Sequence, residues 1–245
     1  MSGSDRHIDR RHDGAATRDR ASGGTEVDAF LDKLARTPNV KPAGTRGRLI
    51  FGMDATASRQ PTWDRASHLQ NRMFLETAAL GGLDVQLVFF RGFSECKSSP
   101  WVSDSARLVD YMGKVSCRGG YTQIGRILKH CAAETRRRRV NALVYVGDCM
   151  EEKVDDLAHL AGELGVLGVP CFVFQEGAEP YARMGFQQIA HLSGGAYCSF
   201  DAGSARALRD LLSAVAVYAA GGRPALEDFA KTHGGDVALL TGQLR

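Results

Sequence analysis

The chain has 245 residues, of which 44% are hydrophobic, enough for one globular domain with flanking segments. The formal net charge is only +3, so the composition gives no case for binding nucleic acid. No apolar run approaches the roughly 20 residues that span a bilayer, and the N-terminus has no apolar signal segment, so we expect neither a membrane nor a secreted protein. The six cysteines contain no Cys-x-x-Cys pair, which favours free thiols and a cytoplasmic location.

The two ends of the chain differ in composition from its middle. Residues 1–24 mix Arg, Asp, His, Gly and Ser with almost no apolar residues, so we expect a disordered tail. Residues 25–45 are expected to form a short helix, over Thr25–Arg36, and a linker. The folded domain is expected at 46–220. It is followed by a C-terminal extension at 221–245, with a predicted helix at Pro224–Thr232 and a predicted strand at Val237–Leu240.

Short apolar runs alternate with amphipathic segments through the middle of the chain. Runs rich in Val, Ile, Leu and Phe are typical of buried strands, and apolar residues at helical spacing predict helices. The alternation predicts an α/β fold, Rossmann-like, with a central, mostly parallel sheet and helices on both faces. The predicted strands are Leu49–Met53, Val85–Phe90, Asn141–Val146, Val169–Gln175 and Ala196–Phe200, and Gly92–Asp104 is a loop or short edge strand. The predicted helices are Thr62–Leu80, Ser105–Val115, Gln123–Arg138, Asp155–Leu167, Pro180–Leu192 and Ser204–Ala219.

Carboxylates and hydroxyls follow two of the predicted strands. Asp54, Thr56 and Ser58 stand at alternate positions after the first strand, and Asp148 follows the strand at Asn141–Val146. Open α/β sheets place their ligand sites at the carboxyl ends of strands, so we expect both carboxylates at one edge. Neighbouring anions repel unless a cation or hydrogen bonds offset them, and Mg²⁺ prefers such oxygen ligands. The alternative is that Asp54, Thr56 and Ser58 only cap the next helix.

Thr122, after the turn Gly119-Gly120-Tyr121, adds a third element to this ordered set. The set resembles the metal-ion-dependent adhesion site of the von Willebrand factor type A domain family. That pattern is Asp-x-Ser-x-Ser after the first strand, a Thr in a loop before a later helix and an Asp after the fourth strand. Here Asp54, Thr56, Ser58, Thr122 and Asp148 stand in those places, with Thr56 where Ser is usual. The resemblance covers about Arg48 to Ala220 and looks closest to bacterial, cytoplasmic members of the family.

The resemblance implies a binding module and not an enzyme. It implies that Thr56 and Ser58 bind Mg²⁺ or Mn²⁺ through their hydroxyls, and that Asp54, Thr122 and Asp148 bind it directly or through water. Mg²⁺ accepts such a shell because it keeps several waters in near-octahedral geometry. In this family an acidic side chain of a partner often fills the open coordination position of the ion. The implied partner is therefore a protein, and neither nucleic acid nor a membrane is expected.

Two other functions stay open. A Mg²⁺-dependent phosphohydrolase of haloacid-dehalogenase-like type also places an Asp after the first strand and a Gly-Asp element late in the sheet, as in Gly147-Asp148. Such an enzyme needs a second carboxylate two residues after the first to act as general acid, a role that Thr56 cannot fill. It also needs a Lys near the late acid, for which Lys153 is only a weak candidate. The other is a metal-independent scaffold that makes its contacts through helices or the C-terminal extension.

The remaining charged and reactive residues are expected to have structural roles. The run Arg136–Arg139 is typical of a solvated helix end, and Cys149 beside Asp148 is typical of core packing. Tyr121, Arg91 and Trp101 come from loops or strand ends that are candidates for the rim of the site.

Overall fold

The structure is a computed structural model that describes residues 29, 33, 46–64, 82–200 and 205–232. The predicted tail, nearly all of the helix and linker at 25–45, most of the helix predicted after Thr62 and the strand predicted at Val237–Leu240 lie outside the described residues. Of the helices in the described part of the chain, none has the length and apolar character that crossing a bilayer requires.

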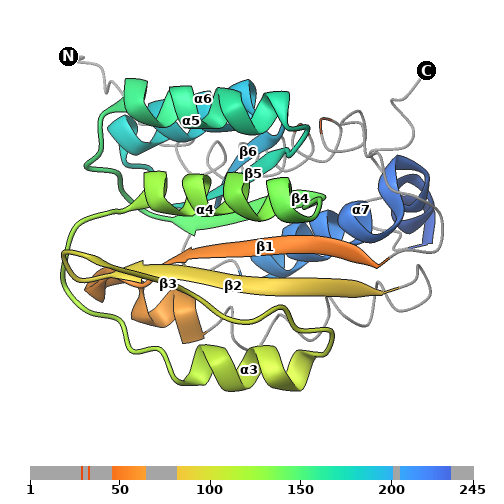
Figure 1. The fold of residues 1–245 in the computed structure, drawn as a ribbon, viewed down its shortest axis with the longest axis horizontal. Coiled ribbons are helices and arrows are strands. Elements are labelled where there is room, and N and C mark those ends of the chain that lie inside the picture. The colour runs from red at the N-terminus through yellow and green to blue at the C-terminus, as the bar shows by residue number, and fades with distance from the viewer. Residues whose placement is uncertain (1–28, 30–32, 34–45, 65–81, 201–204, 233–245) are drawn as a thin grey trace, which may run out of the picture.

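One sheet of six strands, in the order β3-β2-β1-β4-β5-β6, forms the centre of the described part (Figure 1). All neighbouring strands are parallel except β3, which pairs antiparallel with β2 at one edge. This sheet confirms the predicted α/β fold, including a short edge strand within 92–104. The strands are β1 (Gly47–Asp54), β2 (Leu83–Arg91), β3 (Glu95–Ser98), β4 (Ala142–Gly147), β5 (Cys171–Glu176) and β6 (Ala196–Phe200).

Helices cover both faces of the sheet (Figure 1). Because both faces are covered, every residue of β1 is buried, and its side chains alternate between two cores. Leu49, Phe51 and Met53 belong to the core under α3 and α7, and Ile50 belongs to the core under α4, α5 and α6. The helices are α3 (Ser105–Gly113), α4 (Ile124–Arg137), α5 (Val154–Val166), α6 (Pro180–Leu192) and α7 (Ala205–Thr232).

The last helix, α7, packs directly on the first strand. A Cβ atom on Gly47 would lie 2.3 Å from the carbonyl oxygen of Ala219, so only glycine allows this approach. The helix bends at Gly222, which has a positive φ of 73°, and the two predicted helical segments lie on either side of this bend. Leu226 is only 4% exposed and belongs to the same core as β1. This part of the predicted C-terminal extension therefore packs on the domain.

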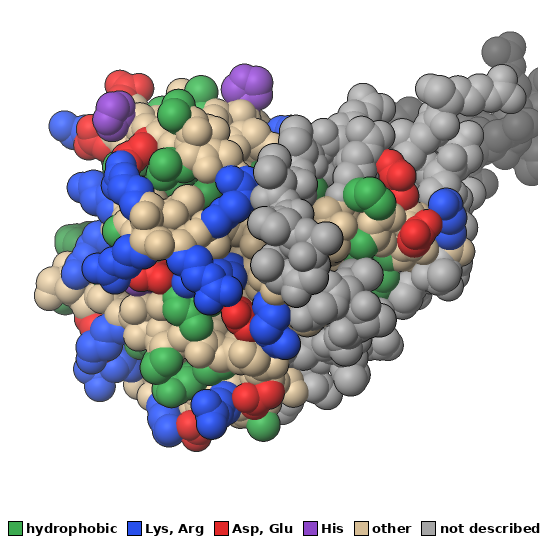
Figure 2. Space-filling model, turned by 45° about the vertical axis from the view of Figure 1, so that its right-hand side comes forward, with side chains coloured by type: hydrophobic (Ala, Val, Ile, Leu, Met, Phe, Trp, Pro, Cys, Tyr) green, Lys and Arg blue, Asp and Glu red, His purple; other side chains and the backbone are tan. Residues whose placement is uncertain are grey.

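Among the charged side chains on the described face shown in Figure 2, Lys and Arg predominate over Asp and Glu.

Most side chains of the arginine run Arg136–Arg139 at the end of α4 contact other residues of the fold. Three of its side chains have partners in the described part of the chain: Arg136 pairs with Glu163, Arg137 with Glu134, and Arg139 donates to the carbonyl of Gly168. These contacts agree with the structural role predicted for the run.

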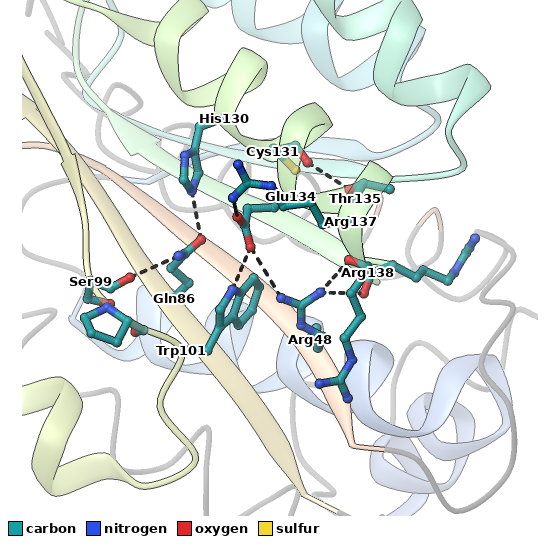
Figure 3. A network of polar contacts seen from close by, with 12 residues as sticks. Arg48, Gln86, Ser99, Trp101, His130, Cys131, Glu134, Thr135, Arg137 and Arg138 are labelled. Carbon is teal, nitrogen blue, oxygen red and sulfur yellow. Dashed lines mark hydrogen bonds and ion pairs between the residues drawn. The ribbon is translucent and has the colours of Figure 1, made fainter.

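A polar network fixes the C-terminal half of α4 to the sheet (Figure 3). The Glu134 carboxylate accepts hydrogen bonds from the Trp101 indole at 2.8 Å and from the Arg48 guanidinium at 3.4 Å. The guanidinium also lies 3.8 Å from the centre of the Trp101 ring, a cation–π contact. Trp101 therefore belongs to this structural network, at the other end of α4 from the predicted site, and the prediction that it rims the site is wrong.

Candidate metal site

The predicted site lies where the strand order of the sheet reverses direction. From β1 the chain continues to β2 on one side, whereas β4 pairs with β1 on the other side. Such a switch point leaves a crevice at the carboxyl ends of the two strands. Asp54 is the last residue of β1 and Asp148 directly follows β4, and the register pairs Met53 with Val146. The two carboxylates therefore meet at this crevice, as predicted.

Asp54 is fully buried, with 0% of its surface exposed. Its Oδ1 atom accepts a hydrogen bond from the backbone N–H of Thr56 at 2.7 Å, whereas Oδ2 has no hydrogen-bond partner among the described residues. Burial raises the pKa of this carboxyl to about 6, and the charge of Asp148 adds to the rise, although hydrogen bonds from Thr56 oppose it. A buried carboxylate with an unpaired oxygen is stabilised by a nearby cation.

Ser58 links the loop after β1 to the loop after β4. Its hydroxyl donates to Oδ2 of Asp148 at 2.8 Å, while Oδ1 of Asp148 is buried without a hydrogen-bond partner in the described part of the chain. Thr56 occupies the N-cap position of the short helix η1 (Ala57–Arg59), but its side chain makes no capping hydrogen bond. The capping alternative therefore does not account for Thr56, and the unpaired oxygens of Asp54 and Asp148 fit a cation site better.

Thr122 reaches the same edge of the sheet through the loop that precedes α4. Its hydroxyl accepts a hydrogen bond from the backbone N–H of Glu151 at 2.9 Å, and its own N–H donates to the Glu151 carboxylate at 2.6 Å. The next residue, Glu152, accepts hydrogen bonds from the N–H groups of Ile124 and Gly125 at the start of α4. These bonds join the Thr122 loop to the loop that carries Asp148.

Sequence reasoning missed Cys149 as a possible ligand. Donor atoms of Asp54, Asp148 and Cys149 all lie within 4.8 Å of one another, so the thiol is close enough to share an ion with both carboxylates. Burial and the neighbouring Asp148 raise the pKa of the thiol to about 12. The position of Cys149 beside Asp148 is the only sequence signal for this role. The described site therefore combines oxygen donors with one softer sulfur atom.

A buried arginine beside the site was also missed. Arg59, directly after Ser58, is 1% exposed and pairs with Glu176 at the end of β5, where the Thr62 hydroxyl also donates. Its positive charge opposes the rise in the pKa of Asp54. Nothing in the sequence distinguishes Arg59 from an exposed arginine, because its partner is distant along the chain. Arg59 gives the crevice a fixed positive charge.

Comparison with solved structures identifies the fold. The chain is similar to the VWA domain of SpRpn10, with a TM-score of 0.54 and 12% identity over 69% of this chain and 94% of that one. It is similar to the PilB minor pilin from Streptococcus sanguinis, with a TM-score of 0.54 and 11% identity over 80% of this chain and 65% of that one.

A third similar structure contains a metal. It is proximal thread matrix protein 1 from the mussel byssus with a zinc-occupied metal-ion-dependent adhesion site, matched with a TM-score of 0.53 and 16% identity over 72% of this chain and 47% of that one. No protein-family model and no curated protein matches the chain in sequence. At these identities the similarity shows the fold alone. The chain has the fold of a von Willebrand factor type A domain.

Proposed function

We propose that this domain is a protein-binding module that holds a divalent cation between the ends of β1 and β4. One observation carries the proposal: two buried carboxylate oxygens, Oδ2 of Asp54 and Oδ1 of Asp148, lack hydrogen-bond partners among the described residues at the switch point of the sheet. Buried anions without partners are costly, and a divalent ion between them removes the cost. The zinc-occupied site of the byssus protein supports the same reading.

The proposed ligands are the five residues predicted from the sequence, Asp54, Thr56, Ser58, Thr122 and Asp148. When bound, the ion supplies a positive charge and at least one position for an outside ligand. Ser58 and Thr56 offer hydroxyls, and the hydrogen bond of Ser58 to Asp148 already joins two of the three loops. Because all five of these ligands offer hard oxygen donors, we propose Mg²⁺ or Mn²⁺ as the ion.

The proposed partner is a protein that supplies an acidic side chain. The chain's own residues would hold the ion and fix its position. A carboxylate of the partner would then complete the coordination shell of the ion. None of the six cysteines forms a disulfide in the described part of the chain, which supports a reducing, cytoplasmic setting for this binding. Phosphohydrolase chemistry is not proposed, because Thr56 offers no carboxylate for a general acid.

A library of random peptides tests this function on the full chain. Peptides retained in the presence of Mn²⁺ and then released by EDTA are expected to contain Asp or Glu, and Asp54→Asn is expected not to retain them. Asp156→Asn, which changes an exposed carboxylate in the first turn of α5, is the matched control and is expected to behave as the wild type. Equal retention by Asp54→Asn, or retention that EDTA does not reverse, would contradict the proposed function.

A further inference from the structure

Large exposed apolar side chains gather at the edge of the sheet that carries the candidate site. Phe93 is 74% exposed and lies between β2 and β3, and Tyr121 is 60% exposed and directly precedes Thr122. Tyr181 and Met184, also exposed, stand in the first turns of α6, which follows the carboxyl end of β5. Exposed apolar clusters on a soluble domain mark interaction sites. This edge therefore offers apolar contact area beside the polar crevice.

Phe93 and Tyr121 form one aromatic pair on this surface. Their ring centres are 5.3 Å apart and the rings are inclined by 71°, an edge-to-face contact. Each ring packs on the other and leaves most of its own surface open to solvent. Aromatic side chains arranged in this way are frequent anchors at protein interfaces.

The backbone on both sides of the pair is fixed. A Cβ atom on Gly120 would lie 2.0 Å from the carbonyl oxygen of Gly92, so the two loops are in direct contact. Side chains of the following helical segment hold the β2–β3 turn: the Gln123 amide donates to the carbonyl of Gly92 at 3.2 Å, and Arg126 donates to the carbonyl of Ser94 at 2.5 Å. A surface that is ordered before binding loses little entropy when a partner binds.

Cationic residues stand in the chain segments next to the aromatic pair. Arg118 and Arg126, both exposed, belong to the segments that flank Tyr121. On the β2–β3 side, the carboxylate of Glu95 is engaged by Arg91 and Lys97, each at 2.9 Å. The surroundings therefore favour an acidic partner segment, which agrees with the acidic side chain that the proposed ion requires.

We propose that the Phe93–Tyr121 pair determines which partners the metal site accepts. The pair receives an aromatic or aliphatic side chain that lies close to the acidic residue in an extended segment of the partner. Tyr121 and Thr122 are adjacent, so their Cα atoms are about 3.8 Å apart, and the two partner residues fall within about three positions of each other. This inference rests on the proposed function. It adds the requirement that the partner carries an apolar residue near its acidic residue.

The same peptide library tests the pair, with the variant Phe93→Ser/Tyr121→Ser. Peptides that the wild type releases with EDTA are expected to carry an aromatic or aliphatic residue within about three positions of the Asp or Glu. The double variant is expected to bind them about tenfold more weakly, a typical loss when an interface anchor is removed, while its affinity for Mn²⁺ alone is unchanged. Val109→Ser/Val166→Ser, which removes exposed apolar side chains from α3 and α5, is the matched control.

The outcomes separate this inference from the proposed function. EDTA-released peptides without an apolar preference, or equal binding to Phe93→Ser/Tyr121→Ser, would overturn the inference and leave the function intact. Peptides that need the aromatic pair but not the metal would contradict the proposed function and overturn this inference with it, because the pair would then bind partners without the metal site. Self-association of the wild type that the double variant lacks would assign the pair to a second copy of the chain and overturn the inference.

Discussion

At the scale of single residues, the buried carboxylate of Asp54 carries an electrostatic cost. Its carboxyl has a pKa of about 6 in the fold against an ordinary value of 3.8, chiefly because it is buried. The folded state therefore binds this proton more tightly than the unfolded state does. Stability is lost as the pH rises from about 4 to about 6, and the loss is complete above that range. A bound cation would offset this cost.

Asp54→Asn is expected to stabilise the metal-free protein at pH 7.5. The shift of about two pH units corresponds to ~3 kcal/mol, so the free energy of unfolding should rise by up to that amount in EDTA. Near pH 4 the difference should vanish, because the carboxyl is then protonated in the folded state. Urea unfolding at both pH values measures this, and an Asp54→Asn variant less stable than the wild type at pH 7.5 would contradict the account.

The sulfur of Cys149 lies close enough to Asp54 and Asp148 to share an ion with them, and we expect it to discriminate between metals. Zn²⁺ binds thiolates strongly, whereas Mg²⁺ does not, and zinc displaces the thiol proton as it binds. Cys149→Ser should therefore weaken Zn²⁺ binding by at least about tenfold and leave Mg²⁺ binding unchanged. Cys96→Ser, in β3, is the control. Competition titrations measure both affinities, and unchanged Zn²⁺ affinity in Cys149→Ser would exclude the thiol as a ligand.

At the scale of elements, Arg59 and Glu176 join the segment after β1 to the end of β5. Arg59→Met removes the charge of Arg59 from its ion pair with the mostly buried Glu176 carboxylate and should lower the free energy of unfolding by about 3–5 kcal/mol. Arg59→Met/Glu176→Gln should recover most of this loss, since neither charge remains and the Gln can still accept from Thr62. Urea unfolding of the wild type and both variants measures this, and a negligible effect of Arg59→Met alone would show that the pair does not hold these elements together.

Local signals made most element bounds predictable. Pro180 begins α6 at a favoured helical position, and Gly194 and Gly195 separate that helix from β6, so both elements have the predicted bounds. The bend of α7 at Gly222, between the two predicted helical segments, was also marked by glycine. Continuous apolar runs identified the strands, because a parallel sheet buried on both faces requires apolar residues at nearly every strand position.

Long-range contacts were not predictable in the same way. Arg59 lies 117 residues from Glu176, and no local pattern reports that they meet. The contact between Phe93 and Tyr121 likewise depends on how two loops fold together. The approach of Asp54 and Asp148 was an exception, because the position of each at the end of a parallel strand places both at one edge of the sheet.

At the scale of the whole molecule, the two ends of the sheet have different roles. The amino ends carry a network in which Arg48, Trp101 and Glu134 anchor α4 (Figure 3). The carboxyl ends carry buried carboxylate oxygens without partners among the described residues, with exposed aromatic rings beside them. The network at the amino ends positions α4, and we propose that a cation and a partner satisfy the unpaired oxygens at the carboxyl ends.

Calorimetric titration of the EDTA-stripped full chain with Mg²⁺ and Mn²⁺ tests the central claim most directly. The account predicts saturable binding at one site in the wild type and in the control Asp156→Asn, and loss of that binding in Asp54→Asn and Asp148→Asn. Saturable binding that persists unchanged in both site variants would place the ion elsewhere, and the absence of binding in the wild type would contradict a cation site formed by this chain alone.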